Sequence, residues 1–346
     1  MTHHPSLSSF VSRGRRYRAF TLLELLVAVA ITLVIAGLML TVTTNVLNLW
    51  RRNQGAQTQA AAARQIFSLL EQDFQSALHR RDATCWLAAD ILDSAPALAN
   101  HGWLTGPGLM KPDGGGSLRP RPEPDAGGNS FLQEARFGLS GIWLRMVATN
   151  VESGGSLPSV VAWQVVRRPV TGDPVATNPA AVRYSLYRSV VSNSDTFASG
   201  YDVTATAYGS TSNTPSSALS TAYRLPRNVT NPSHANLLAS NAVDFGCWLY
   251  VRDTVGSLRR VYPANATDVS HHAIGDSTSD DTRFPDVADV MVRILSDEGA
   301  TLIEAMEGGH VVRPAAYATD AEWWWSVVEL HSAVFIRRIE IKGGTW

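Results

Sequence analysis

The sequence contains little cysteine, little charge and almost no charge imbalance. Its two cysteines, Cys85 and Cys247, are too few for a disulfide-dense scaffold or an all-cysteine zinc site. Charged residues make up 17% of the chain, whereas soluble domains usually contain about 25%. The formal net charge of −1 lacks the basic surplus that is typical of nucleic-acid binders, so we expect no nucleic-acid partner.

Motifs that mark common enzyme classes are also missing. The sequence has no G-x-S-x-G, H-E-x-x-H or G-x-x-x-x-G-K-[ST] pattern, which serve serine hydrolases, zinc proteases and nucleotide-binding enzymes. Serine, histidine and aspartate are scattered, and such residues form a catalytic triad only through their geometry. We therefore expect a protein that is not an enzyme and needs no cofactor. A single-span anchored hydrolase is the weakest alternative.

The N-terminus concentrates positive charge in front of a long apolar run. Residues 1–19 contain no acid and four arginines, namely Arg13, Arg15, Arg16 and Arg18. The run from Phe20 to Val42 is almost entirely apolar, and as a helix it would be about 34 Å long, enough for a bilayer core. The positive-inside rule places the arginines in the cytoplasm and the bulk of the chain outside.

A single carboxylate, Glu24, interrupts this apolar run. A lone acid within a membrane span is costly unless a cation pairs with it, and no A-x-A cleavage site of a secretory signal follows the run. The sequence from Arg18 to Leu25, RAFTLLEL, resembles the cleavage and methylation motif of type IV prepilins and type II secretion pseudopilins. A plain signal anchor is the alternative.

This resemblance implies a particular route of processing and assembly. A prepilin peptidase would cut between Ala19 and Phe20 and methylate the new N-terminus at Phe20. Glu24 would then neutralise the N-terminal amine of a neighbouring subunit, or its own, which agrees with the cost of an unpaired intramembrane carboxylate. Ala19 stands where the family usually has glycine, and we expect slower cleavage for that reason.

The helix is expected to continue beyond the membrane. Residues 54–64 are rich in strong helix formers. From Ile66 to Leu78 apolar residues recur every three or four positions opposite a polar face, which predicts an amphipathic helix packed on a globular domain. We expect one helix from Phe20 to about His79, in which Gly37 and Gly55 are weak points.

The remainder of the chain has the composition of a mostly antiparallel β domain. Residues 106–128 and 192–221 are rich in Gly, Pro, Ser or Thr, which predicts two long loop insertions. Runs rich in Val, Ile, Tyr and Trp predict strands at Gly141–Ala148, Val160–Arg167, Arg183–Val191, Ala242–Val251, Val287–Ile294 and Val327–Ile341. The predicted fold class is α+β, a pilin-like lollipop whose long N-terminal helix packs on a β-rich head.

Several segments resemble the minor pseudopilin called J. The stem contains L-x-x-D followed by a hydrophobic residue at Leu70–Phe74, and an expected strand contains Y-x-L-x-R at Tyr184–Arg188. Residues 236–245 and 284–292 resemble the two elements that follow in that subfamily. The long leader and insertions resemble the Verru_Chthon cassette protein C family, and this resemblance implies no biochemical activity.

Two polar groups of the expected head are candidate metal ligands. Asp276, Asp280 and Asp281 form an acidic loop whose oxygens suit calcium, and a solvated loop without a metal is the more ordinary alternative. His271 and His272 are neighbours in the sequence. Adjacent side chains of an extended chain diverge, which argues against a metal shared by these two histidines.

Two further groups have a structural and a functional interpretation. Trp323, Trp324 and Trp325 are a candidate contact for a sugar or a partner protein, or core packing within a strand. Cys85 and Cys247 can form a disulfide in an oxidising compartment, or remain two buried thiols.

These features predict a cleaved cytoplasmic leader at 1–19, a pilin helix at 20–82 that spans the membrane at 20–42, and a periplasmic J-like head at 83–346. The expected function is that of a minor, tip-located pseudopilin of a type II secretion or type IV pilus-like assembly in the inner membrane. The expected partners are other pilin or pseudopilin subunits, the prepilin peptidase, the inner-membrane assembly platform and the lipid bilayer. The alternative is a pilus-displayed adhesion module that uses the three tryptophans.

Overall fold

The computed structural model divides the chain into two compact units, Met1–Gln54 and Gly55–Trp346. The described residues are 21–92, 103, 111–112, 141–150, 157–170, 181–205, 229–230, 232–264, 269–275, 277, 279, 281–342 and 344–345. We call the described part of Gly55–Trp346 the head. The four leader arginines and the expected cleavage site lie outside the described residues.

The first element is α1, a helix from Leu22 to Gln75. The sequence predicted that this helix would end near His79, but it ends at Gln75. It ends earlier because residues 77–79 pair with other β segments. Ala77 forms a bridge with Ala148. The two-residue strand β1 (Leu78–His79) then pairs in parallel with β12 (Gly344–Thr345).

The larger sheet of the head has six antiparallel strands in the order β6-β5-β4-β3-β2-β9. Their bounds are Cys85–Leu92 for β2, Gly141–Asn150 for β3, Leu157–Pro169 for β4, Val182–Val190 for β5, Leu237–Ser240 for β6 and Ser270–Ile274 for β9. Every residue of β4 after Leu157 is buried. Both faces of the sheet are therefore covered at this strand, which explains its long apolar run.

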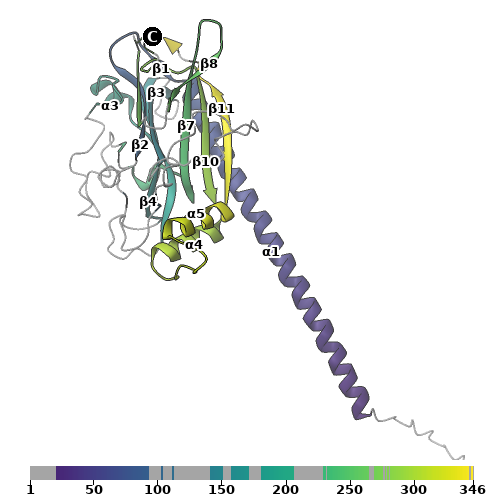
Figure 1. The fold of residues 1–346 in the computed structure, drawn as a ribbon. Coiled ribbons are helices and arrows are strands. Elements are labelled where there is room, and N and C mark those ends of the chain that lie inside the picture. The colour runs from purple at the N-terminus through teal and green to yellow at the C-terminus, as the bar shows by residue number, and fades with distance from the viewer. Residues whose placement is uncertain are drawn as a thin grey trace, which may run out of the picture. The chain divides into compact units, whose positions relative to one another are not determined.

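The smaller sheet has four antiparallel strands in the order β11-β10-β7-β8, and Figure 1 shows β7, β10 and β11 side by side. The strands are Ala242–Arg252 for β7, Leu258–Tyr262 for β8, Val287–Leu295 for β10 and Ser332–Glu340 for β11. Helices α4 (Asp297–Glu307) and α5 (Asp320–His331) lie at one end of these strands (Figure 1). Short helices also occur at Asn193–Ala198 (α3) and His234–Asn236 (η5).

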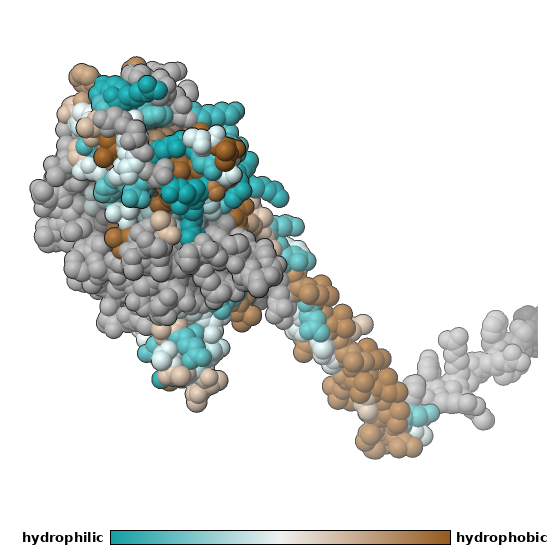
Figure 2. Space-filling model, turned by 45° about the horizontal axis from the view of Figure 1, so that its top comes forward, coloured by the Kyte–Doolittle hydropathy of each residue, from teal (hydrophilic) through white to brown (hydrophobic). Residues whose placement is uncertain are grey.

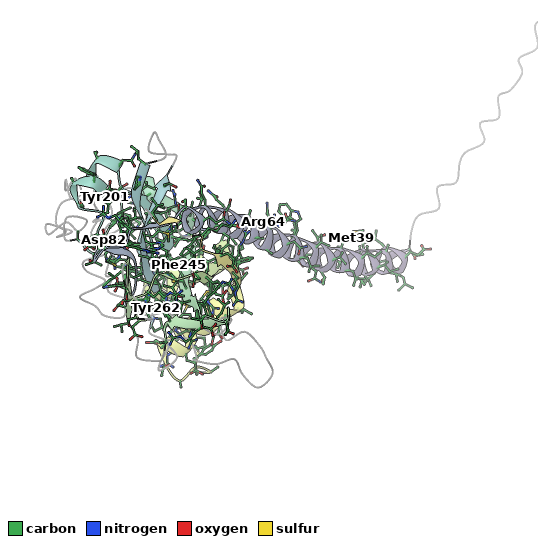
Figure 3. All side chains as sticks on the ribbon, turned by 90° about the horizontal axis from the view of Figure 1, so that it is seen from above. Met39, Arg64, Asp82, Tyr201, Phe245 and Tyr262 are labelled. Carbon is green, nitrogen blue, oxygen red and sulfur yellow. The ribbon has the colours of Figure 1, made fainter. Side chains whose placement is uncertain are left out.

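One hydrophobic core joins both sheets to the part of α1 that belongs to the head. The stripe that the sequence predicted is buried there, since Ile66, Leu70 and Phe74 are fully covered. Between the sheets, the rings of Trp163 in β4 and Phe245 in β7 stack with centroids 6.3 Å apart. Figure 3 shows Phe245 among the packed side chains of the head. The fold is α+β, as the sequence predicted.

The strand that the sequence predicted at Val327–Ile341 is wrong over its first part, which belongs to α5. A strong N-cap overrides the β propensity of the aromatic and β-branched residues here. The Thr319 hydroxyl accepts a hydrogen bond from the Glu322 N–H, and the Glu322 carboxylate accepts one from the Ala318 N–H. These bonds satisfy backbone donors at the helix start.

The structure describes only part of the two expected insertions. Within 192–221, residues 193–198 form α3, which Ser192 caps through a hydrogen bond from the Asp195 N–H. The expectation of an irregular loop is therefore wrong for these residues. Within 106–128, only Lys111 and Pro112 belong to the described residues.

Candidate functional sites of the stem and the head

The first turn of α1 places Glu24 against Thr21. The Thr21 backbone N–H and hydroxyl donate to Glu24 Oε2 over 2.9 Å and 3.0 Å. In return, the Glu24 N–H donates to Thr21 Oγ1 over 3.2 Å. This capping box starts the helix at Leu22 and holds the carboxylate at the positive end of the helix dipole. A carboxylate at this position is able to pair with a nearby cation, such as an N-terminal amine.

The apolar part of α1 has the properties of a membrane span. Leu22–Leu47 comprises 26 residues that contain an 18-residue window with a mean hydropathy of 2.8, and none of the 26 residues is buried. Figure 2 shows the apolar surface of this segment. The hydroxyls of Thr32, Thr41 and Thr43 each donate to a main-chain carbonyl one turn earlier, over 2.8–2.9 Å. These polar side chains are thus satisfied within the helix, as an apolar environment requires.

A buried ion pair links α1 to the larger sheet. Arg188 of β5 donates to both carboxylate oxygens of Asp73, through Nε over 3.0 Å and Nη2 over 2.8 Å. Trp163 of β4 donates its indole N–H to the same carboxylate over 2.8 Å. Asp73 belongs to the L-x-x-D pattern of the stem and Arg188 to the Y-x-L-x-R pattern of a strand. The structure brings these two residues into contact in the core.

The three consecutive tryptophans lie on α5 and are buried, with exposed fractions of 8% for Trp323, 0% for Trp324 and 4% for Trp325. A strand, which was one possibility for these residues, is not observed, because the N-cap at Thr319 starts a helix here. Of the two interpretations of the tryptophans, core packing agrees with their burial in the described structure. Trp324 donates its indole N–H to Glu307 over 3.0 Å, and Trp325 donates to the Pro112 carbonyl over 3.2 Å.

Glu307, at the end of α4, is the centre of a buried polar cluster. It accepts hydrogen bonds from Arg167 Nε over 2.6 Å and from the Tyr184 hydroxyl. Burial raises the pKa of Glu307, and the bonds from Arg167, Tyr184 and Trp324 oppose that rise. The Tyr184 oxygen in turn accepts the Lys111 backbone N–H over 2.6 Å, and Lys111 Nζ lies 3.1 Å from Asp244 Oδ1.

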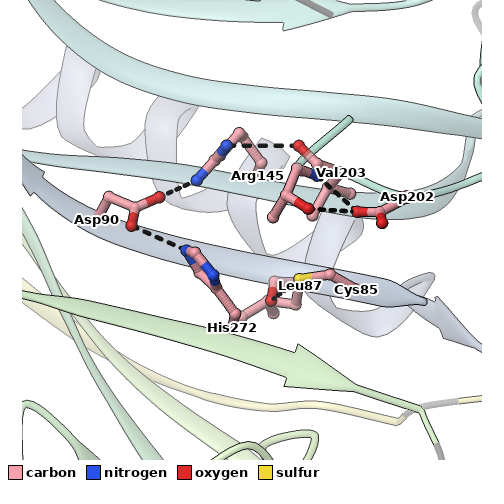
Figure 4. Close-up of polar contacts among 8 residues, drawn as sticks. Cys85, Leu87, Asp90, Arg145, Asp202, Val203 and His272 are labelled. Carbon is pink, nitrogen blue, oxygen red and sulfur yellow. Dashed lines mark hydrogen bonds and ion pairs between the residues drawn. The ribbon is translucent and has the colours of Figure 1, made fainter. Parts of the chain in front are cut away.

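A second polar cluster lies on the larger sheet, where Asp90 of β2 contacts both Arg145 of β3 and His272 of β9 (Figure 4). The His272 Nε2 lies 3.0 Å from Asp90 Oδ1. Burial lowers the pKa of Arg145 to about 10. Its guanidinium also lies 3.5 Å from the centroid of the Trp143 ring. The cluster joins three adjacent strands through an ion pair between Asp90 and Arg145 and a polar contact between Asp90 and His272.

The two adjacent histidines diverge, as the sequence predicted. His271 is buried and its Nε2 lies 3.2 Å from the Arg283 carbonyl oxygen, whereas His272 faces Asp90. Within the described residues no group of three His, Cys, Asp or Glu side chains is placed to hold a metal ion. Of the acidic loop, Asp281 is described, whereas Asp276 and Asp280 lie outside the described residues.

Both cysteines are buried free thiols in the structure. Cys85 belongs to β2 of the larger sheet and Cys247 to β7 of the smaller one. Burial raises the pKa of Cys85 to about 12 and also raises the pKa of Cys247. The sequence left open a disulfide or two buried thiols, and the structure has two buried thiols. Their raised pKa values make these thiols unreactive.

Comparison with known proteins identifies the N-terminal segment. Residues 14–40 match the family described as the Prokaryotic N-terminal methylation motif. No curated protein and no solved structure matches the chain. The match supports a prepilin-like protein of the pilin and pseudopilin kind, and with the apolar helix it supports a membrane-anchored, single-pass chain. The resemblance to the Verru_Chthon cassette protein C family stays a prediction.

Sequence reasoning missed the clusters around Glu307 and Asp90. Their members come from segments far apart in the sequence, and no spacing or local pattern links Lys111 to Asp244 or Arg145 to His272. The only signal was an unusual residue type in an apolar context, such as Asp244 and Arg145 within strands rich in Val, Leu and aromatic residues.

Proposed function

We propose that this protein is a structural subunit of a type II secretion or type IV pilus-like assembly. The methylation motif over residues 14–40 carries this proposal, and the exposed apolar helix and the capping box of Glu24 support it. In the proposed route, a prepilin peptidase removes residues 1–19 and methylates Phe20. Glu24 then pairs with an N-terminal amine while the apolar helices of neighbouring subunits associate.

The proposed location is the inner membrane, with the leader in the cytoplasm and the head in the periplasm. Partners are other pilin or pseudopilin subunits, the peptidase, the assembly platform and the lipid bilayer. We assign the protein to the tip as a minor, J-like subunit, because a head with long insertions would crowd if it recurred at every subunit step. Finding it at the stoichiometry of a shaft subunit in purified filaments would contradict the tip position.

Mass spectrometry of the N-terminus tests the proposed processing. Protein extracted from membranes should begin with N-methylated Phe20, whereas an intact Met1 would overturn the assembly route. A variant with Glu24→Gln provides the matched comparison. It should still be cut after Ala19 but should no longer co-purify with partner subunits, because its side chain cannot neutralise an amine.

The burial of the three tryptophans removes the observation that favoured an adhesion module. The adhesion alternative relied on Trp323, Trp324 and Trp325 as a contact surface, and these side chains are covered. Replacing them is therefore expected to lower the stability of the head rather than to remove a binding surface. No other observation on the described residues favours an adhesive or hydrolytic head over a structural one.

A further inference from the structure

A lysine and an aspartate face each other in the core of the head. Lys111 Nζ lies 3.1 Å from Asp244 Oδ1, and the side chains of both residues are completely buried. The two residues are 133 positions apart in the sequence. Asp244 projects from β7 of the smaller sheet. An ion pair in such a place gains less than its short distance suggests, because both charges have lost their hydration.

The surroundings of this pair exclude water and hold the lysine in place. The Lys111 ammonium lies 5.8 Å from the centroid of the Trp325 ring. The Trp325 indole N–H donates to the carbonyl of Pro112, the residue after Lys111. The Lys111 backbone N–H donates to the Tyr184 hydroxyl over 2.6 Å. The backbone of Lys111 is thus fixed on both sides, so its side chain is held against Asp244.

The carboxylate is incompletely satisfied. Asp244 Oδ1 contacts Lys111 Nζ, whereas Oδ2 is buried and has no hydrogen-bond partner among the described residues. A buried carboxylate oxygen without a partner carries a desolvation penalty. An amide has one oxygen fewer than a carboxylate, so condensation of the pair would remove both the orphan oxygen and the two charges.

From this geometry we propose that Lys111 and Asp244 condense to an intramolecular amide that joins their side chains. A proton passes from the Nζ ammonium to the carboxylate, which gives a neutral amine and a neutral carboxylic acid. The amine nitrogen attacks Cγ, the C–O bond breaks, and one water molecule leaves with one carboxyl oxygen and two protons. The reaction needs no oxidant and no cofactor, because its only products are the amide and one water molecule. The contact distance and the fixed backbone supply the proximity that such a reaction needs.

The amide would anchor the chain around Lys111 to a central strand of the smaller sheet. The connection would be covalent and insensitive to reduction, in contrast to a disulfide. It would suit an exported structural subunit that must resist unfolding, although the inference itself rests on the head alone and not on the proposed assembly.

Peptide mapping of the full-length protein tests the proposal directly. The protein is extracted in detergent, denatured, digested and analysed by tandem mass spectrometry. The expected result is a branched peptide that contains residues 111 and 244 and whose mass is lower than the sum of its two parts by one water molecule. Recovery of the Lys111 and Asp244 segments as separate peptides of unmodified mass would overturn the proposal, whatever the N-terminus proves to be.

Three variants sharpen the assignment. Lys111→Arg keeps the positive charge but lacks the amine nucleophile, so the branched peptide should be absent. Lys342→Arg makes the same change at an exposed lysine, and the branched peptide should remain. Asp244→Asn should give the same branched peptide, because the identical amide forms with loss of ammonia. A branched peptide that persists in Lys111→Arg would contradict the proposed bond.

Discussion

Asp73 and Arg188 are 115 positions apart in the sequence and form a two-point ion pair in the core of the head. Asp73 lies near the end of α1 and Arg188 lies in β5. The side chains are 3% and 7% exposed, respectively, so water cannot replace either partner. The Trp163 indole N–H binds the same carboxylate, and the pair therefore fixes the helix to two strands at once.

Removing one partner of this pair should destabilise the head strongly. We expect Asp73→Ala to lower the free energy of unfolding by about 3 kcal/mol or more, because the buried Arg188 charge and the Trp163 N–H would both lose the carboxylate that accepts their hydrogen bonds. Urea unfolding of the detergent-solubilised chain, followed by tryptophan fluorescence, measures the change.

A surface ion pair between the same helix and β11 provides the control. Glu71 and Arg337 are 2.6 Å apart, but their side chains are 34% and 45% exposed. Glu71→Ala should therefore cost less than about 1 kcal/mol. Equal losses in the two variants would show that the Asp73 pair contributes no more than a solvated contact.

The sequence predicted the parts of this fold that depend on local patterns. The buried stripe of α1 follows from its 3.6-residue periodicity, and β4, β7 and β10 follow from runs of Val, Ile and Trp. Strand β2 escaped prediction because its sequence, CWLAADIL, is rich in the helix formers Ala and Leu. Its strand conformation comes from pairing with β3 and β9, which is a tertiary effect.

The candidate sites likewise divide into those that a local sequence pattern predicts and those that depend on contacts between distant segments. The motif around Glu24 is contiguous, so the sequence was sufficient to find it. The strand predicted at Val327–Ile341 begins too early because the capping residues Thr319 and Glu322, which start α5, were overlooked. The contacts of Lys111 with Asp244 and Tyr184 depend on how distant segments pack, and no local property of the sequence encodes these pairs.

The buried His271 should make the head less stable in mild acid. Burial lowers the pKa of His271 to about 4 from its usual value of 6.5. Between these values the unfolded chain binds a proton that the folded chain does not bind, so stability falls as the pH drops from 6.5 towards 4. We expect this histidine to contribute a loss of about 2 kcal/mol between pH 7 and pH 5.

Comparing unfolding at the two pH values with and without this side chain measures the effect. His271→Gln should show a smaller loss between pH 7 and pH 5 than the wild-type chain. His310→Gln, at an exposed position after α4, should retain the wild-type loss. An unchanged pH dependence in His271→Gln would mean that other groups account for the acid sensitivity.

Gly141 permits a close approach between the two sheets. It begins β3 with φ of +93°, and a Cβ added there would lie 2.7 Å from the Phe245 carbonyl oxygen. We expect Gly141→Ala to lower the free energy of unfolding by about 3 kcal/mol, because the backbone strain is combined with a clash against main-chain atoms.

Gly256 serves as a control that separates the cost of the backbone conformation from the cost of the steric clash. Gly256 has φ of +87°, but a Cβ added there would meet no atom within 4 Å. Gly256→Ala should therefore cost only about 1 kcal/mol, from the backbone conformation alone. If the two variants lose the same stability in urea unfolding, contact with Phe245 is not the constraint at Gly141.

The residue before the proposed cut should limit the rate of processing. Ala19 stands where the resembled family usually has glycine, and we expect its additional methyl group to slow cleavage by the peptidase. Ala19→Gly should therefore increase the processed fraction at early times in a pulse-chase experiment, and Ala19→Leu should suppress processing. Gly14→Ala changes a leader glycine away from the cut and should leave the rate unchanged. If Ala19→Gly is processed no faster than the wild-type chain, the methyl group of Ala19 does not limit cleavage, and the rate is set by another part of the leader or by access of the span to the peptidase.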